Sequence, residues 1–254
     1  RGLGKAIAFK LAEEGASVII NGRRSKTVVN TVYEIKRKFN FNIQAYQCTA
    51  DAARPDMIKR FFLEKMPLIG KLDILVNNVG NIEKKAPLFD LRDEDWLRQF
   101  ELSFMSMVRF SRESFEWLKN SGHGRIINIS SLASTQPGFN ASYAHYVAAK
   151  AAMERVAKIM ANDFGRYNIT VNTICPSTLH GGGWLENVKR RAEKDGVSET
   201  EAEKDMLAEE KAKSPLLRIG QLGDVADYVA FLASDRAAFI TGQVIYADGG
   251  IKRC

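Results

Sequence analysis

Short, strongly apolar runs alternate along the chain with longer segments whose apolar residues recur every three or four positions. The short runs are rich in β-branched residues, which is typical of buried strands, and the longer segments have the period of helices that bury one face. We expect strands at Ser17–Asn21, Ile43–Cys48, Leu72–Val76, Gly124–Ser131, Ile169–Ile174 and Gln243–Ala247. We expect helices at Lys5–Glu14, Thr27–Phe39, Pro55–Glu64, Asp93–Asn120 and Asp224–Ala233, and one that contains Tyr146 and continues to Phe164.

This alternation predicts an α/β fold of the Rossmann type, a doubly wound parallel sheet with helices on both faces. No repeat or linker is visible, and 254 residues suit one domain, so we expect 1–254 to form a single unit. Three glycines at 181–183 precede a highly charged helical segment, Trp184–Lys213. A substrate lid at about 181–213 would suit this position, and a solvated helical hairpin is the alternative.

Tyr146 and Lys150 are four residues apart, so they lie on one face of a helix, a single turn from each other. An ammonium group near a phenol favours the phenolate, so we expect a lowered Tyr146 pKa and a side chain able to exchange protons near neutral pH. The alternative is an ordinary helix surface, since this spacing also arises by chance. Upstream, a predicted buried strand ends in two hydroxyls, and the second of them, Ser131, shortly precedes the tyrosine helix.

Gly2 and Gly4 stand at the mouth of the first predicted helix. Glycines there allow a pyrophosphate to approach the free N–H groups of a helix N-terminus; an unliganded turn is the alternative. The next strand leads to Gly22, Arg23 and Arg24, with no acidic residue that would bind the ribose 2′-hydroxyl of NAD. Two guanidinium groups can instead bind a 2′-phosphate, although one of them alone would suffice.

Several motifs in order resemble the short-chain dehydrogenase/reductase family across essentially the whole chain. The matching segments are Arg1-Gly2-Leu3-Gly4, Asn77-Asn78-Val79-Gly80, Ser131 with Tyr146-x-x-x-Lys150, Pro176, Arg218-x-Gly220 and Asp248-Gly249-Gly250. One such motif is weak evidence, whereas the ordered set is specific.

The resemblance implies hydride transfer between NADP(H) and a carbonyl or secondary alcohol. It makes Tyr146 the general acid/base, Ser131 a hydrogen-bond donor to the substrate oxygen, and Lys150 the group that lowers the tyrosine pKa and holds the nicotinamide ribose. The most similar relatives are 3-oxoacyl-acyl-carrier-protein reductases, with sugar or secondary-alcohol dehydrogenases as the alternative. The cofactor residues it implies are Arg1, Gly2, Leu3, Gly4, Arg23, Arg24, Asp51, Asn77, Gly80, Tyr146, Lys150, Pro176 and Thr178.

The chain departs from the family pattern at several places. Ser103 occupies the position of an asparagine that holds a water linked to the catalytic lysine, and its shorter side chain makes such a relay doubtful. Ser177 replaces a glycine, so Thr178 is only a substitute for the usual contact to the nicotinamide carboxamide. Asp51 resembles the acid that touches the adenine amine, but a turn carboxylate is nearly as good an interpretation. The first strand and first glycine are absent, so we expect that this numbering begins inside the real polypeptide.

Composition narrows the function further. The net charge is +7, which suits a phosphate-bearing cofactor or an acidic acyl carrier as well as a simple solvated surface. The basic residues are dispersed, so we expect no nucleic-acid partner, and no apolar run is long enough for a membrane helix. Three scattered cysteines indicate a reducing, cytoplasmic setting with Cys48 and Cys175 in the core, and three dispersed histidines predict no metal site.

Two further expectations concern assembly and activity. The family forms oligomers, and small residues on the tyrosine helix suit close packing against a copy of itself, so we expect a homodimer or homotetramer. Loss of the asparagine and the glycine also leaves open a rival of another class, a dinucleotide-binding scaffold or sensor with impaired catalysis. Retention of Ser131, Tyr146 and Lys150 favours the enzyme.

Overall fold

The computed structural model describes residues 2–136 and 142–252. Its strands are β1 (Val18–Gly22), β2 (Ala45–Thr49), β3 (Ile74–Asn77), β4 (Arg125–Ile129), β5 (Thr170–Pro176), β6 (Leu179–His180), β7 (Gly220–Gln221) and β8 (Val244–Ala247). Its longer helices are α1 (Gly2–Glu13), α2 (Ser25–Lys38), α3 (Pro55–Glu64), α5 (Asp93–Phe100), α6 (Ser106–Ser121), α7 (Ala144–Phe164), α8 (Gly182–Asp195), α9 (Glu199–Lys213) and α10 (Leu222–Ala233). A short helix, α4 (Met66–Ile69), follows α3. Each strand predicted from the sequence is present within a few residues, and the short pair β6–β7 was not foreseen.

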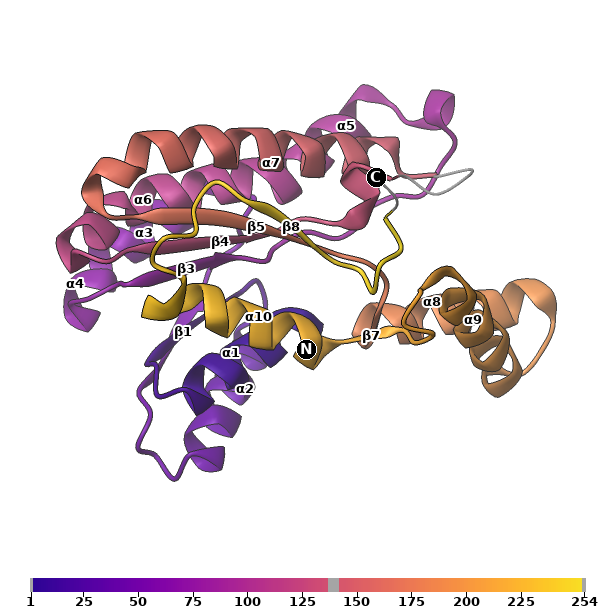
Figure 1. Ribbon diagram of the computed structural model, residues 1–254, viewed down its shortest axis with the longest axis horizontal. Coiled ribbons are helices and arrows are strands. Elements are labelled where there is room, and N and C mark those ends of the chain that lie inside the picture. The colour runs from indigo at the N-terminus through magenta and orange to yellow at the C-terminus, as the bar shows by residue number, and fades with distance from the viewer. Residues whose placement is uncertain (1, 137–141, 253–254) are drawn as a thin grey trace.

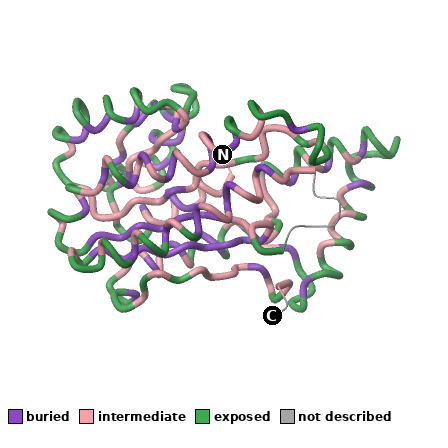
Figure 2. Tube along the Cα trace, turned by 90° about the horizontal axis from the view of Figure 1, so that it is seen from above, coloured by how far each residue is buried: buried purple, intermediate pink, exposed green. Residues whose placement is uncertain are grey.

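The central sheet is parallel and has the order β3-β4-β5-β8. Most residues of its strands are apolar because both faces are covered, by α6 and α7 on one side and by α1 and α10 on the other (Figure 1). Figure 2 shows the buried stretches running along the strands through the middle of the molecule. The prediction of an α/β, Rossmann-type doubly wound fold is confirmed.

The parallel sheet is not continuous across the molecule. β1 and β2 pair with each other but not with β3, and a cavity of about 790 Å³ separates the two sheets. Apolar side chains from both sides line this gap, among them Val18 and Ile20 of β1 and Leu75 and Val76 of β3. The pair β1–β2 is therefore a separate sheet from β3-β4-β5-β8 in this structure.

The long helix predicted at 93–120 is present over residues 93–121, but it contains a π-helical turn that the sequence pattern did not predict. A π-helical turn, Glu101–Met105, lies between α5 and α6. A π-turn inserts one extra residue into the helix, so it rotates the side chains that follow it relative to an unbroken α-helix. Ser103 lies within this turn and is fully buried.

Helices α8 and α9 form a hairpin that projects from one end of the sheet, next to β7 (Figure 1). The hairpin has a small core of its own, built from Trp184, Val188, Ala192, Ala202 and Ile219. The predicted helical character of 184–213 is therefore confirmed, with a turn at Gly196. None of the helices in the described ranges is both long and apolar enough to cross a membrane.

Candidate active site

Ser130 and Ser131 follow the carboxyl end of β4. The strand is buried along its whole length, so it fixes the position of the polar residues that come after it. Ser131 then begins a 3₁₀ turn, Leu132–Ser134, and its Oγ accepts a hydrogen bond of 3.2 Å from the Ala133 N–H. The hydroxyl is thus oriented by its own turn at the edge of the sheet.

Tyr146 and Lys150 reach the same place from α7, which packs on β5. A side-chain hydrogen bond joins Tyr146 to Ser131. The Lys150 Nζ lies 5.8 Å from the centre of the tyrosine ring and donates a 2.7 Å hydrogen bond to the Ile129 carbonyl at the end of β4. The three side chains that the sequence singled out therefore meet at the carboxyl edge of the sheet.

The electrostatics differ from our expectation for the tyrosine. Burial raises the Tyr146 pKa above its ordinary value, and the hydrogen bond with Ser131 only partly opposes this effect. Burial also lowers the Lys150 pKa to about 8, although Cys175 and Glu154 act in the opposite direction. The expected fall of the Tyr146 pKa was wrong for this structure, because desolvation outweighs the hydrogen bond with Ser131.

Gly80 lies against the buried lysine. A Cβ atom at this position would stand 2.9 Å from the Lys150 Nζ and 3.2 Å from the Ser103 Oγ. The residue has a φ of 149°, in the region that favours glycine. The loop after β3 can thus pass directly over Lys150 and Ser103, and the same geometry places the Ser103 hydroxyl beside the lysine.

Gln99 was missed by the sequence reasoning. It is fully buried one turn before Ser103, and its Nε2 donates to the Ser103 Oγ at 2.7 Å and to the Asn81 carbonyl at 2.9 Å. Its Oε1 accepts from the Glu83 N–H at 3.1 Å. Gln99 therefore fixes both Ser103 and the loop that follows Gly80. A buried glutamine four residues before Ser103 was the available signal.

The predicted phosphate-binding end lies at the start of α1 and the end of β1. A Cβ on Gly4 would stand 2.8 Å from the Asn78 Nδ2, so glycine is needed for the two segments to approach. Arg23 and Arg24 are exposed, and neither guanidinium pairs with a carboxylate within residues 2–136 and 142–252. Gly4 and both arginines line one end of the cavity between the sheets.

The other predicted cofactor residues are placed as follows. The buried Asn77 donates to the Asn128 Oδ1 at 2.9 Å, so its side chain joins β3 to β4. The Asp51 Oδ1 accepts from the Ala53 N–H at 3.0 Å, as a turn carboxylate does. Pro176 ends β5 and is buried, whereas Thr178 is exposed. Gly2 and Leu3 form the first turn of α1, and Arg1 lies outside the described residues.

His145, Cys48 and Cys175 are packed in the interior of the protein. His145 is buried against Trp96, with ring centres 6.1 Å apart. Cys48 and Cys175 are free and buried, which confirms their core placement, and Cys254 lies outside the described residues. In the part of the chain that the structure describes, no group of histidine, cysteine and acidic side chains is arranged to hold a metal ion.

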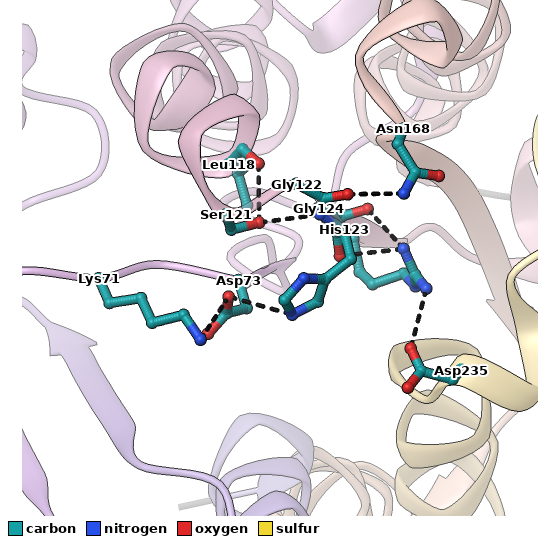
Figure 3. Close-up of polar contacts among 10 residues, drawn as sticks. Lys71, Asp73, Leu118, Ser121, Gly122, His123, Gly124, Asn168 and Asp235 are labelled. Carbon is teal, nitrogen blue, oxygen red and sulfur yellow. Dashed lines mark hydrogen bonds and ion pairs between the residues drawn. The ribbon is translucent and has the colours of Figure 1, made fainter.

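A second polar cluster lies at the opposite edge of the sheet, before β3 and β4 (Figure 3). The Asp73 Oδ1 stands 3.2 Å from the Lys71 Nζ and 3.3 Å from the His123 Nε2. Arg125, which is buried, donates to the His123 carbonyl and pairs with Asp235 at 3.4 Å. Lys71, His123 and Asp235 of this cluster are exposed, and Lys71 and Asp73 line the same cavity as Gly4 and the two arginines.

Comparison with known proteins defines the class. A family model described as enoyl-(acyl carrier protein) reductase matches residues 1–252. The Bacillus subtilis protein named uncharacterized oxidoreductase YvaG is 34% identical over 252 residues, which cover 99% of this chain and 92% of that protein. The 3-oxoacyl-[acyl-carrier-protein] reductase FabG of Staphylococcus epidermidis is 32% identical over 252 residues, covering 99% and 95%. The chain therefore belongs to the short-chain dehydrogenase/reductase family of oxidoreductases.

Solved structures agree with this assignment. L-sorbose reductase from Gluconobacter frateurii, crystallised with NADPH and L-sorbose, superposes with a TM-score of 0.92 at 27% identity, covering 100% of this chain and 93% of that one. YwfH, an NADPH-dependent reductase involved in bacilysin biosynthesis, superposes with a TM-score of 0.88 at 27% identity, covering 100% and 95%. The resemblance stated from the sequence motifs is thus confirmed at the level of family and fold.

Proposed function

We propose that this protein is an NADP(H)-dependent reductase that interconverts a carbonyl and a secondary alcohol. The single observation that carries the proposal is the meeting of Ser131, Tyr146 and Lys150 at the carboxyl edge of the sheet. Hydroxyl, phenol and ammonium groups there can hold a substrate oxygen and move a proton to or from it. If Tyr146 and Lys150 belonged to an ordinary helix surface, their side chains would be exposed to water rather than buried together.

The residues present fit an NADP(H) cofactor. Gly4 leaves the start of α1 open to close approach, and Gly80 leaves no side chain between its loop and Lys150. Arg23 and Arg24 offer cations that carboxylates of the described chain do not neutralise, and the strand end before them has no acid to repel a 2′-phosphate. The NADPH in the related sorbose reductase structure supports the same cofactor choice. When bound, the nicotinamide would supply or accept the hydride.

The proton steps belong to the chain itself. Tyr146 donates its phenolic proton to the oxygen of a carbonyl substrate, and its raised pKa keeps that proton in place until it is needed. Ser131 donates a hydrogen bond to the same oxygen and stabilises the charge that develops there. Lys150, held by the Ile129 carbonyl, stabilises the phenolate that remains. Ser103, with Gln99 behind it, is placed to hold a water beside the lysine.

The substrate class is the finer part of the proposal. Relatives that reduce 3-oxoacyl-acyl-carrier-protein and L-sorbose cover two candidates, a carrier-bound ketone and a small sugar. The net charge of +7 would favour an acidic carrier, so we rank the carrier-bound substrate first. We also retain the predicted cytoplasmic location, the homodimer or homotetramer, and a lid formed by 181–213, whose hairpin has its own core.

A scaffold or sensor without turnover is the rival function, and two measurements separate it from an enzyme. Titration with NADPH should succeed for both. Oxidation of NADPH in the presence of a panel of carbonyl compounds, including a 3-oxoacyl thioester and ketoses, should be observed only for the reductase. Absence of turnover with every member of the panel, in protein that binds NADPH, would favour the sensor.

A further inference from the structure

Glu154 is a buried carboxylate beneath the candidate active site. It lies on α7, one turn beyond Lys150, and only 2% of its surface is exposed. Tyr146, Lys150 and Glu154 are spaced by four residues each, so they follow one another along the same face of the helix. A fully buried acid is rare unless it is paired or hydrogen-bonded, so its partners indicate what it does.

Those partners are the residues on either side of Ser131. The Ser130 Oγ donates to the Glu154 Oε1 at 2.7 Å, and the Ser134 Oγ lies within hydrogen-bond distance of the same oxygen. The Ser134 Oγ also lies 2.6 Å from the Ser131 carbonyl oxygen. Ser130 and Ser134, which stand before and after Ser131, therefore hold its turn to the same Glu154 carboxylate.

The same carboxylate lies one turn of α7 from the lysine. The negative charge of Glu154 opposes the desolvation that lowers the Lys150 pKa to about 8. The other titratable groups near the ammonium are Tyr146 on α7 and Cys175 on β5, and burial holds the Cys175 thiol protonated by raising its pKa to about 12. Among these neighbours, Glu154 is the one whose ordinary charge at neutral pH is negative.

We propose that Glu154 is a positioning residue of the active site: it fixes the turn that carries Ser131 and supplies the negative charge that keeps Lys150 protonated. The effect of Glu154 on turnover rests on the proposed reductase function. The contacts that Glu154 makes do not depend on that function. The Cys175 Sγ, which donates to the same Glu154 oxygen at 3.3 Å, completes a set of donors around that carboxylate. Because all of these donors are neutral, they do not cancel the negative charge of Glu154, which can still stabilise the Lys150 ammonium group.

The test is the Glu154→Gln variant, which keeps an oxygen acceptor of the same shape and removes the charge. Titration of Lys150, followed by NMR of protein with ¹³C-labelled lysine and assigned by the signal lost in Lys150→Met, should show a midpoint lower by about one pH unit. The alkaline limb of kcat should move in the same direction, with a loss of up to about tenfold on that limb. Asp163→Asn, exposed on the same helix, should change neither quantity.

An unchanged Lys150 titration in folded Glu154→Gln would overturn the proposal. If that variant does not fold, Ser134→Ala serves instead: it should lower kcat several-fold while the dissociation constant for NADPH stays the same, and an unchanged kcat would equally overturn it. The NMR titration does not depend on turnover. A wild-type protein that reduces no carbonyl would therefore contradict the proposed function, while a lowered midpoint in Glu154→Gln would still support the role of Glu154.

Discussion

The two ends of β4 carry polar clusters of opposite character. At its amino end, Arg125 contacts loop carbonyls and Asp235, which is 94% exposed, and Asp73 lies between the exposed Lys71 and His123 (Figure 3). At its carboxyl end, the strand leads into Ser131 beside Lys150, which is 1% exposed. The same strand thus begins beside solvated ion pairs and ends beside a desolvated lysine.

The two clusters differ in how far their charged groups are exposed to solvent. Exposed ion pairs are screened by water and salt, so each contributes little. A lysine kept inside the protein loses hydration, and the fold must compensate it with the Ile129 carbonyl and with Glu154. Perturbed titratable groups that gather in one place are characteristic of functional sites.

The largest effect should come from removing the buried charge at the carboxyl end. In Lys150→Met we expect kcat to fall about 100-fold, since the Tyr146 phenolate loses its stabilising cation. Wild-type reduction should decline as pH rises through about 8, where Lys150 loses its proton, and this limb should be absent from the variant. The measurement is kcat between pH 6 and pH 10.

The stability of Lys150→Met tests whether Lys150 has a structural role. Because the Lys150 pKa is lower in the folded protein than in the unfolded chain, the unfolded chain binds the proton more tightly, and burial of the ammonium costs stability below about pH 8. The urea midpoint of Lys150→Met at pH 7 should therefore not fall. A large loss of stability together with the loss of turnover would show that Lys150 is structural.

Gly80→Ala should have the next largest effect. The added methyl group would meet Lys150 and Ser103, and the backbone conformation is unfavourable for alanine. We expect a loss of about 1–3 kcal/mol in the free energy of unfolding and a clear fall in kcat. Gly223→Ala, which meets nothing within 4 Å, is the matched control for urea unfolding and turnover. Equal behaviour of the two variants would contradict the close approach at Gly80.

Replacing Arg23 and Arg24 should change the preference for NADPH over NADH, with a smaller effect than the Lys150 and Gly80 substitutions. Replacing both by alanine should weaken NADPH binding by about tenfold or more, because a charge-assisted hydrogen bond contributes about 1.5–3 kcal/mol. Binding of NADH, which lacks the 2′-phosphate, should change little. Fluorescence titration with both nucleotides measures the ratio; equal weakening of the two would argue against a phosphate contact.

The smallest effect should come from the amino end of β4. Asp73→Asn removes the carboxylate that faces Lys71 and His123, and we expect a change in unfolding free energy of about 0–1 kcal/mol. Turnover should equal that of the wild type. A severe loss of kcat in this variant would break the distinction between the two clusters.

Much of this arrangement could be predicted from residue order alone. Alternating apolar runs give strands and helices, and the spacing of Tyr146 and Lys150 fixes their common helix face. The position of Ser131 after a buried strand gives the third group. These features are local, or follow from the rule that parallel strands end at one edge of the sheet.

Other parts depend on packing that no spacing reveals. The π-turn at Ser103 and its contact with Gln99 require the helix to break locally, which the continuous apolar stripe did not indicate. The direction of the Tyr146 pKa depends first on how deeply the side chain is buried, which residue spacing does not reveal. Glu154 looks in sequence like any acid on a helix surface, and only the fold places it beneath Ser131.

The most direct test of the account is the turnover of Tyr146→Phe measured beside the wild type, with NADPH and the carbonyl substrate that the panel identifies. The variant lacks only the phenolic oxygen, so it should bind NADPH with nearly unchanged affinity while kcat falls by about 10²-fold or more. Tyr143→Phe, whose ring lies 6.2 Å from that of Tyr146, should retain turnover. Full activity of Tyr146→Phe would contradict the assignment of proton transfer to this site.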